Sequence, residues 1–546
     1  MPRKPKPNKG PLANMTQAEL EEIVQQTVTN QLAIEMGPSR KIRRYESRTL
    51  SEYLIETGLT MKKHTFPHIS LRTPLVKYNR REGEKPPIEM HLPFMTAAMQ
   101  SVTGPDMMIR AAQLGFIGTG FCSQPVKLEA KMVEKVKRAK AGFVIPHCVS
   151  ENDLVDEVLK LTDRYSTFPV TENGKPDGRV VGVLTRYGLW KKIHAGRGIK
   201  VRELMLPYDE MVDYDLVVAA DDLSALNNKM VAKAKKYLVV VDDVKESRRL
   251  QHMVFRKDLD QALENPHALI RKSDKTYVTA AAVNTHDYKK RIAKLVDAGV
   301  DIIVIDSSDG YSEWQGDVLK YMKRNHKTVP VMGGNVINRE GFRFLVENGA
   351  WAVKVGMGGG SICITREQKG TGKGQADAVE EVCDERDKYY EKEGIYIPVI
   401  SDGGVVVSKD IVVALILGAD AVMMGRYFAR FQESPPDVDE RTGMKPYWGE
   451  GSRKAREWMA KRYGQMAFEE GVEGMVPYLG PMERTIRDTV IKMKSTMISA
   501  GCSNIEELHL NGRLIPISAM TMREGGAHDI IMSDPLGSYM QREWGR

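Results

Sequence analysis

The chain has 546 residues, of which 42% are hydrophobic and 28% charged, the balance of a folded globular protein and not of a disordered or fibrous one. Its length predicts two or three domains. No apolar run approaches the roughly 18 residues of a membrane helix, so we expect no membrane span. Residues 1–10 are basic, and we expect no secretory signal there. The net charge of +8 favours small anionic ligands weakly and gives little support for nucleic-acid binding.

The first predicted element is an amphipathic helix within an N-terminal extension, residues 1–44. Apolar side chains recur there at every fourth position, and Gly37-Pro38 ends the pattern: Leu20, Val24, Val28, Leu32 and Met36. Basic clusters flank the helix on both sides. It could dock on a partner, pack on its own domain or remain mobile, and the sequence leaves these readings open.

Eight short apolar runs follow, each ending in small or polar residues. We expect strands at residues 92–97, 116–120, 277–283, 301–306, 329–333, 351–356, 397–402 and 421–425. Most of them are followed by a helical pattern, and this alternation is typical of a parallel β/α array. Eight such repeats are the number that forms a closed barrel. An open doubly wound sheet is the alternative. Glycine-rich and polar residues follow many strands, which favours an α/β fold of the (β/α)8 TIM-barrel type.

A gap between the second and third strands, residues 145–266, contains its own internal repeat. Residues 167–189 and 237–259 each show a β-branched strand, a charged turn, a second strand and the start of a helix. We therefore predict a duplicated α/β module inserted into a barrel made of residues 45–144 and 267–546.

The five cysteines are scattered and form no CxxC pair, so we expect no disulfide framework or zinc site and a reducing, cytoplasmic location. A lone cysteine is usually a small core residue. Cys363 is the exception, because it follows four glycines in a loop, residues 356–370, that could cradle a phosphate or coordinate a cation. Its neighbours Ser361, Thr365 and Arg366 add polar groups that can favour a reactive thiol.

Glycine-containing turns follow the seventh and eighth strands, where barrels most often bind phosphate on backbone amides. These turns are residues 401–404 and 425–427, and Arg426 adds a charge-assisted contact. Asp402 could bind ribose hydroxyls. Residues 306–310, after the fourth strand, carry four oxygen-bearing side chains that suit a second ribose or a capped turn, which spacing alone does not separate.

With these residues in view, the chain from about residue 48 to 534 resembles the IMP dehydrogenase family. The resemblance rests on several separate motifs, at residues 97–102, 306–310, 356–370, 401–404, 447–451, 469–472 and 524–529. It implies that the insert is a tandem CBS (Bateman) regulatory module. Residues 1–44 have no counterpart in it.

The resemblance implies that Cys363 attacks C2 of inosine monophosphate, that hydride passes to NAD, and that water releases xanthosine monophosphate. Thr365 is expected to be catalytic too, as a proton relay in the activation of that water. The other implied ligand contacts fall into three groups. The nucleotide would be held by Ser361, Asp402, Gly403, Gly404, Gly425, Arg426, Tyr447, Gly449, Gly451 and Glu470. NAD would contact Asp306, Ser307, Ser308, Gly356 and Arg366. A potassium ion would lie on carbonyls of Gly356, Gly358 and Cys363, completed by Glu524, Gly525 and Gly526 of a neighbouring subunit.

Such a shared cation site implies a homotetramer, which CBS modules can pair into an octamer, and purine nucleotides could bind the CBS module. The resemblance also implies that Arg462 and Tyr463 on a flap activate water. Only eight steps separate Arg462 from Glu470, shorter than the family leads us to expect.

This short segment favours the sister enzyme GMP reductase, which reduces guanosine monophosphate with NADPH and needs no hydrolytic pair. The Arg-Tyr pair, the motif at residues 524–529 and the insert favour the dehydrogenase. A third reading is a nucleotide sensor or nucleic-acid-binding protein that has lost catalysis. The basic N-terminus alone supports nucleic acid, and the intact Cys363 and Thr365 argue against lost catalysis.

Overall fold

A computed structural model describes residues 46–139, 147–162, 165–190, 198–219, 223–271, 276–455 and 468–526. The chain divides into a unit of residues 1–47 and a unit of residues 48–546, and the second is described here. The predicted N-terminal helix lies outside the described residues, as do Arg462 and Tyr463. Among the described helices, none has both the length and the apolar character needed to cross a bilayer.

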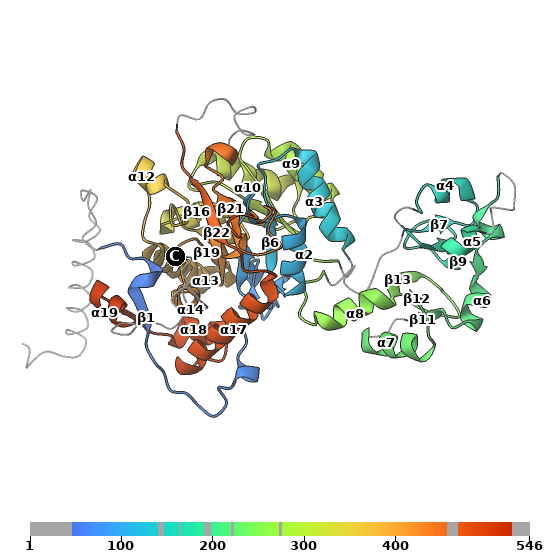
Figure 1. Cartoon of the computed structure of the whole chain (residues 1–546), viewed down its shortest axis with the longest axis horizontal. Helices are drawn as coiled ribbons and strands as arrows, with labels where there is room; N and C mark the ends of the chain where they lie inside the picture. The colour runs from blue at the N-terminus through green and yellow to red at the C-terminus, as the bar shows by residue number, and fades with distance from the viewer. Residues whose placement is uncertain are drawn as a thin grey trace, which may run out of the picture. The chain divides into compact units, whose positions relative to one another are not determined.

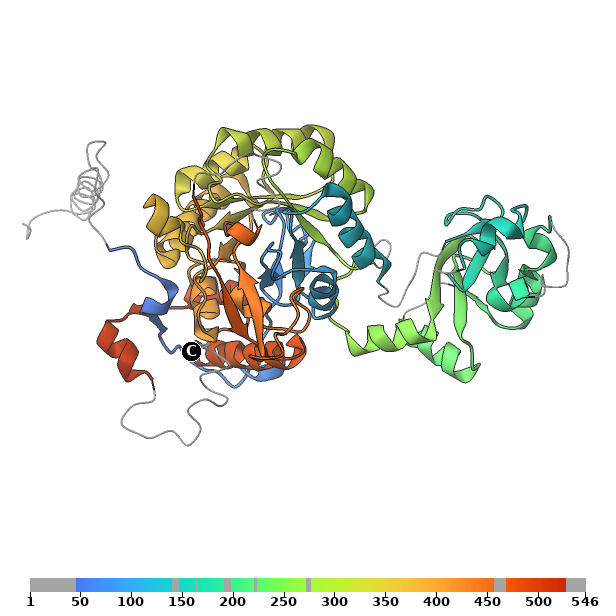
Figure 2. The same cartoon turned by 45° about the horizontal axis from the view of Figure 1, so that its top comes forward.

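Eight parallel strands form a closed barrel, with helices around them (Figures 1 and 2). In chain order the strands are β5 (Phe94–Thr96), β6 (Ile117–Gly120), β14 (Ala280–Val283), β15 (Ile302–Ile305), β16 (Val331–Val336), β17 (Ala352–Val355), β19 (Val399–Asp402) and β20 (Ala421–Met424). Each overlaps one of the eight predicted runs, and the barrel prediction is confirmed. The main differences are at residues 277–279, which were expected in a strand and precede β14 instead, and at β16, which was expected at residues 329–333.

Helices follow the strands as a (β/α)8 fold requires. They are α2 (Pro105–Gln113), α3 (Val126–Arg138), α9 (Tyr288–Asp297), α10 (Glu313–Asn325), α11 (Arg339–Glu347), α13 (Gln375–Glu393), α14 (Ser408–Ile416) and α15 (Arg426–Ala429). A short helix, α12 (Thr365–Lys369), precedes α13, and α17 (Met482–Ser499), α18 (Ile505–Asn511) and α19 (Ala519–Glu524) end the described chain.

Smaller strand pairs decorate the barrel. Three of these pairs are β1 (Tyr53–Ile55) with β23 (Leu514–Pro516), β2 (Thr73–Pro74) with β4 (Glu89–Met90), and β3 (Tyr78–Asn79) with β18 (Ile395–Tyr396). A fourth pair, β21 (Met444–Trp448) with β22 (Glu473–Pro477), is antiparallel and brings the residues on both sides of the flap segment together.

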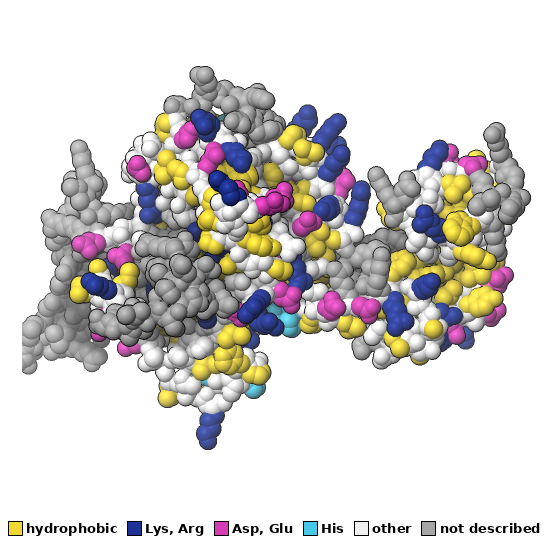
Figure 3. Space-filling model, viewed as in Figure 1, with side chains coloured by type: hydrophobic (Ala, Val, Ile, Leu, Met, Phe, Trp, Pro, Cys, Tyr) yellow, Lys and Arg dark blue, Asp and Glu magenta, His cyan; other side chains and the backbone are white. Residues whose placement is uncertain are grey.

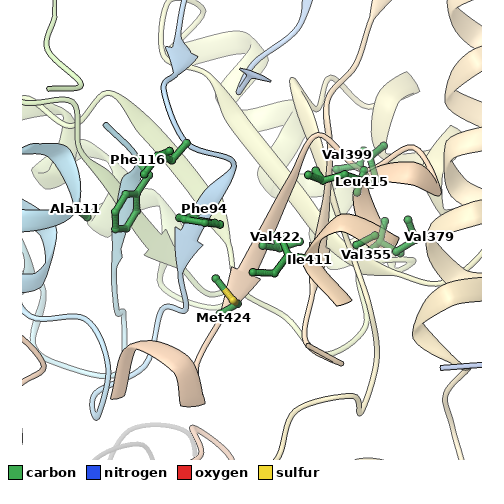
Figure 4. Packing of buried hydrophobic residues seen from close by; sticks show 14 of the residues in the cluster. Phe94, Ala111, Phe116, Val355, Val379, Val399, Ile411, Leu415, Val422 and Met424 are labelled. Carbon is green, nitrogen blue, oxygen red and sulfur yellow. The ribbon is translucent and has the colours of Figure 1, made fainter. Parts of the chain in front are cut away.

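Alternate residues of the strands face two different cores. Phe94, Val422 and Met424 belong to the core shared with helix residues such as Ile411 and Leu415 of α14, and Phe94 lies beside Phe116 (Figure 4). Met95 and Met423, the intervening residues, belong to the core inside the barrel. This two-residue period, combined with the four-residue spacing on α14, is why the apolar runs form strands under amphipathic helices.

The insert contains two units with the same strand order. The first has β7 (Val149–Ser150), β8 (Thr167–Thr171) and β9 (Val180–Thr185), followed in its sheet by β10 (Leu206–Pro207). The second has β11 (Val217–Ala219), β12 (Tyr237–Val241) and β13 (Leu250–Phe255). The helices are α4 (Val155–Leu159), α5 (Arg186–Trp190), α6 (Tyr208–Asp213), α7 (Leu223–Ala232) and α8 (Arg256–Glu264).

An approximate twofold axis relates the two units. Arg179 forms a β-bridge with Arg249, which lies 70 positions later in the chain. Val180 N donates to Arg248 O at 2.9 Å, and the residues 70 positions from these two form the reciprocal bond, in which Leu250 N donates to Gly178 O at 3.2 Å. The same offset relates residues 167–189 to 237–259, so the repeat seen in the sequence is a structural duplication.

Candidate active site

The candidate residues lie at the carboxyl ends of the barrel strands. Asp306 follows β15, Gly356 follows β17, Asp402 ends β19 and Gly425 follows β20. Because all eight strands are parallel, these ends share one face of the barrel, where TIM-barrel enzymes carry their active sites.

The loop after β17 holds Cys363 in a fixed turn. Gly356 has φ +140°, and a Cβ there would lie 2.2 Å from Asp402 O, so the position requires glycine. Cys363 N donates to Gly360 O at 3.1 Å, and Arg366 Nε donates to Met357 O at 2.8 Å. Arg366, expected at the cofactor, therefore also ties the loop to itself.

Cys363 is the half-buried cysteine, whereas Cys122, Cys148, Cys383 and Cys502 are buried. Burial raises the pKa of Cys148 to about 12 and also raises the pKa of Cys122 and Cys383, so these three stay protonated thiols. The sequence-based choice of Cys363 as the accessible thiol agrees with these positions.

A chain of polar contacts leads away from the Cys363 sulfur. Its Sγ lies 3.1 Å from Thr365 Oγ1, which donates to Glu470 Oε2 at 3.1 Å. Glu470 Oε1 in turn lies 3.0 Å from Lys369 Nζ. Glu470, expected at the purine, is thus in contact with the hydroxyl next to the thiol, a position in which a carboxylate can take up a proton.

The phosphate-loop candidates come together beside this thiol. Gly404 N donates to Gly359 O at 3.1 Å, which joins the loop after β19 to the cysteine loop. Gly403 and Gly404 both have positive φ, +86° and +76°. At Gly425 a Cβ would lie 2.8 Å from Tyr447 Oη, so the glycine lets the tyrosine approach.

Tyr447 is buried between these loops. Burial raises the pKa of Tyr447 to about 12, and a hydrogen bond with Ser361 acts against that shift. The phenol therefore stays neutral near pH 7 and can donate to an anion. Arg426, the first residue of α15, donates to Val406 O at 3.2 Å and adds positive charge nearby.

A buried charge cluster lies under Asp306 and Asp402. Lys354 Nζ is 2.8 Å from Asp402 Oδ2 and 3.8 Å from Asp306 Oδ1. Asn335 donates to Asp402 Oδ2 at 2.9 Å and to Gly356 O at 2.7 Å. Burial works against the charge of Lys354, but the two aspartates raise its pKa above its usual value. The cluster therefore holds both carboxylates in place.

Lys354 and Asn335 were not among the sequence candidates. A single lysine in the otherwise apolar strand Ala352–Val355 was the available signal, because a fully buried lysine requires charged partners.

The motif at residues 447–451 packs on the loop after β5. Trp448 Nε1 donates to Gln100 Oε1 at 3.2 Å, and Ser101 Oγ donates to Trp448 O at 2.8 Å. Gln100 N donates to Glu450 Oε1 at 2.6 Å. Glu470 N donates to Gly451 O at 3.2 Å, and Gly449 lies against Ile362, so these glycines border the cysteine loop.

A cavity of about 320 Å³ adjoins Thr365 on the side of β15 and β16. Ser308, Asp309, Met357, Thr365 and Lys369 are among its lining residues. Of the five residues expected to contact NAD, Ser308 lines this cavity, and Asp306 and Ser307 directly precede it in the chain. Glu524, Gly525 and Gly526 lie at the exposed end of α19 on this protomer.

On the face drawn in Figure 3, lysine and arginine side chains stand at several separate places among acidic and apolar ones. This mixture is typical of a solvated surface.

The chain is similar to proteins of one enzyme family. A family model described as the IMP dehydrogenase / GMP reductase domain matches residues 52–528. Inosine-5'-monophosphate dehydrogenase from Tritrichomonas foetus is 40% identical over 502 residues, which are 90% of this chain and 97% of the relative. The dehydrogenase of Aquifex aeolicus is 32% identical over 463 residues, covering 83% and 91%.

Among solved structures, a GMP reductase variant from Trypanosoma brucei in complex with guanosine 5'-monophosphate matches with a TM-score of 0.71 and 25% identity. The match covers 91% of this chain and 100% of that one. That share is too large to leave out residues 145–266, so the insert does not by itself separate the two activities. The chain belongs to the IMP dehydrogenase / GMP reductase family.

Proposed function

We propose that the protein oxidises inosine 5'-monophosphate to xanthosine 5'-monophosphate through a covalent bond to Cys363, with NAD as the hydride acceptor. The observation that carries this proposal is the half-buried Cys363 thiol, 3.1 Å from Thr365 and bordered by the glycine loops after three strands. The names of the curated relatives support inosine monophosphate as the substrate.

The glycine loops suit the nucleotide's ribose phosphate. The backbone amide of Gly425, with the hydroxyls of Ser361 and Tyr447 and the charge of Arg426, would bind the phosphate. Gly403 and Gly404, whose own amides donate to Met423 O and Gly359 O, would let it approach the backbone closely. Asp402 would accept from the ribose hydroxyls, since Lys354 and Asn335 fix its carboxylate. Gly449 and Gly451 would border the purine, where a side chain would fill the space.

In the first step the Cys363 sulfur forms a bond to C2 of the purine. The thiol proton passes to Thr365 Oγ1 while the Thr365 proton passes to Glu470 Oε2. As the S–C bond forms, the C2=N3 π bond breaks and its electron pair moves to N3, from where it re-forms that bond when hydride leaves C2. C2 is then tetrahedral, so its hydrogen can leave with both bonding electrons. NAD, when bound, accepts that hydride.

In the second step water replaces the sulfur. It adds to C2 while the C2=N3 π pair takes up one water proton at N3. The C–S bond then breaks, its electron pair goes to Cys363, which takes up the second water proton, and xanthosine monophosphate is released while the proton on Glu470 passes to solvent. Arg462 and Tyr463 would activate this water according to the family resemblance, and both lie outside the described residues.

The site suits the two further groups that the family implies. The cavity lined by Ser308, Asp309 and Thr365 offers hydroxyl and carboxylate groups for a ribose of NAD. For potassium, Gln375 Oε1 is buried, has no hydrogen-bond partner among the described residues, and lies next to the backbone of Gly356. An orphaned carbonyl oxygen among carbonyl-rich glycines suits a monovalent cation, which Gly358 and Cys363 carbonyls would help to hold, although Gly356 O already accepts from Asn335.

The quaternary and regulatory assignments are also proposals. Glu524, Gly525 and Gly526 of a second subunit would complete the potassium site, which implies a tetramer. The duplicated insert would be the CBS module, able to pair tetramers and to bind purine nucleotides. A cytoplasmic location agrees with five free cysteines.

GMP reductase is the second candidate function, favoured by the structural match to the Trypanosoma brucei enzyme. Purified protein should therefore be tested with inosine monophosphate plus NAD and, separately, with guanosine monophosphate plus NADPH. We expect NADH and xanthosine monophosphate in the first mixture. Oxidation of NADPH in the second, with no product in the first, would replace the dehydrogenase proposal by the reductase.

A further inference from the structure

One short helix holds both carboxylate oxygens of Glu470. Thr365 is the first residue of α12 and Lys369 the last, so the two side chains lie on the same side of one helical turn. Thr365 Oγ1 donates to Oε2 at 3.1 Å, and Lys369 Nζ lies 3.0 Å from Oε1. Gly370, with φ +68°, ends the helix directly after Lys369.

The backbone of Glu470 is fixed independently of Lys369. Ile364 N donates to Glu470 O at 2.9 Å, Glu470 N donates to Gly451 O at 3.2 Å, and Gly471 forms a β-bridge with Cys363. The ion pair is thus not needed to place the chain. It sets the orientation of the carboxylate, whose side chain has three rotatable bonds.

Stability is a weak reason for this ion pair. The Lys369 side chain is 37% exposed and that of Glu470 13%, and partly exposed ion pairs contribute little to folding. The orientation of the Glu470 carboxylate instead determines in which direction the Thr365 hydroxyl donates its single proton. When that proton is donated to Glu470, the oxygen presents a lone pair to its other neighbour, the Cys363 sulfur at 3.1 Å.

We propose that Lys369 is a positioning residue: it holds the Glu470 carboxylate as the acceptor of the Thr365 hydroxyl, so that Thr365 can take the proton of the Cys363 thiol. The inference rests on the proposed role of Cys363 as the nucleophile. Lys369 itself touches none of the reacting atoms.

The first test replaces Lys369 with methionine, which keeps most of the side-chain length and removes the charge. We expect Lys369→Met to lower kcat about tenfold, because proton transfer loses its oriented acceptor, while KM for inosine monophosphate and for NAD changes by less than about twofold. Lys369→Arg, which keeps a cation in place, should retain at least about half of the wild-type kcat.

A double-mutant cycle separates positioning from a general structural effect. In a Glu470→Gln background the charge partner is gone, so adding Lys369→Met should change kcat by less than about twofold. Losses that multiply in the double variant would overturn the proposal. Because Lys369 also lines the cavity beside Ser308, a raised KM for NAD with unchanged kcat would overturn it as well, by making Lys369 a binding residue.

A measurement without nucleotides keeps this inference separate from the proposed function. The rate at which iodoacetamide alkylates Cys363 at one fixed pH, mapped by mass spectrometry, should fall several-fold in Lys369→Met and stay near wild type in Lys369→Arg. Absence of xanthosine monophosphate production by the unmutated protein would refute the proposed function alone. Equal alkylation rates in Lys369→Met and the wild type would refute the role of Lys369.

Discussion

Removal of one sulfur atom is the most direct test at the residue scale. Cys363→Ala should lower turnover below about 1% of wild type, because no other described cysteine is accessible to replace the nucleophile. The phosphate and ribose contacts come from other residues, so the Kd for inosine monophosphate should change by less than about threefold. Steady-state assays and calorimetric titration measure the two quantities. Several per cent of residual turnover would exclude the covalent mechanism.

A second residue-scale prediction concerns pH. Burial raises the pKa of Glu450 from 4.5 to about 7, against the hydrogen bond from Gln100 N that lowers it. Between these values the folded protein keeps a proton that the unfolded chain has released, so stability falls as pH rises through this window. Above pH 7 the ionised Glu450 lowers the free energy of unfolding by its full amount, about 3 kcal/mol.

Glu450→Gln should remove this loss of stability at high pH, while the amide oxygen of the new glutamine still accepts a hydrogen bond from Gln100 N. We expect the variant to match the wild type in thermal midpoint near pH 4.5 and to exceed it near pH 8, by differential scanning fluorimetry across that range. Parallel curves for the two proteins would show that Glu450 does not titrate in this window.

At the scale of elements, the turn after β17 depends on glycine. Gly356→Ala places a Cβ 2.2 Å from Asp402 O at φ +140°, so the loops after β17 and β19 must separate. We expect a loss of at least about 2 kcal/mol in unfolding free energy. Gly474→Ala, in β22 with nothing within 4 Å of the new Cβ, is the matched control and should stay within about 0.5 kcal/mol. Equal effects of the two substitutions would contradict the close approach of the loops.

The elements themselves were largely predictable. Runs such as residues 421–425 are apolar, short and bounded by glycine, so local pattern alone identifies the strand Ala421–Met424. The offset of 70 between the halves of the insert was also visible in the sequence, and Arg179 and Arg249 pair across it.

Contacts between distant residues were not predictable in the same way. Glu470 was expected at the purine, and no sequence pattern indicated that its oxygens also reach Thr365 and Lys369, more than 100 positions earlier. That contact forms only because β21 and β22 fold the chain back onto the cysteine loop. Lys354 shows the same limit: its buried position follows from its strand, but its partners Asp306 and Asp402 follow from barrel closure.

At the scale of the whole molecule, the insert should be removable. At the end of the insert the chain rejoins the barrel. There the His267 ring stacks on the His91 ring with 3.7 Å between the ring centroids, and Leu269 N donates to Ala112 O at 2.7 Å. A chain lacking residues 145–266, joined by a short glycine-serine linker, should keep at least about half of the wild-type kcat. Loss of the barrel's thermal transition would contradict the insertion boundaries.

The cation prediction also belongs to the assembled molecule. If carbonyls of the cysteine loop and a neighbouring C-terminal segment hold potassium, activity should require potassium and not be supported by sodium, which is smaller and more strongly hydrated. Initial rates in the two chloride salts at equal ionic strength test this, with rubidium as a control of similar size. Equal rates in sodium and potassium would remove the cation from the site.

Closure of the barrel has a consequence for synthesis on the ribosome. β5 pairs with β6 on one side and with β20 on the other, and β20 begins 325 positions after β5 ends (421 − 96). At 5–20 residues per second, the apolar edge of β5 waits roughly 15–65 s for its last neighbour, while the intervening insert is complete much earlier. The nascent chain therefore contains the fully synthesised insert while the barrel sheet is still open. Chaperone binding during translation should concentrate on residues that later line the barrel.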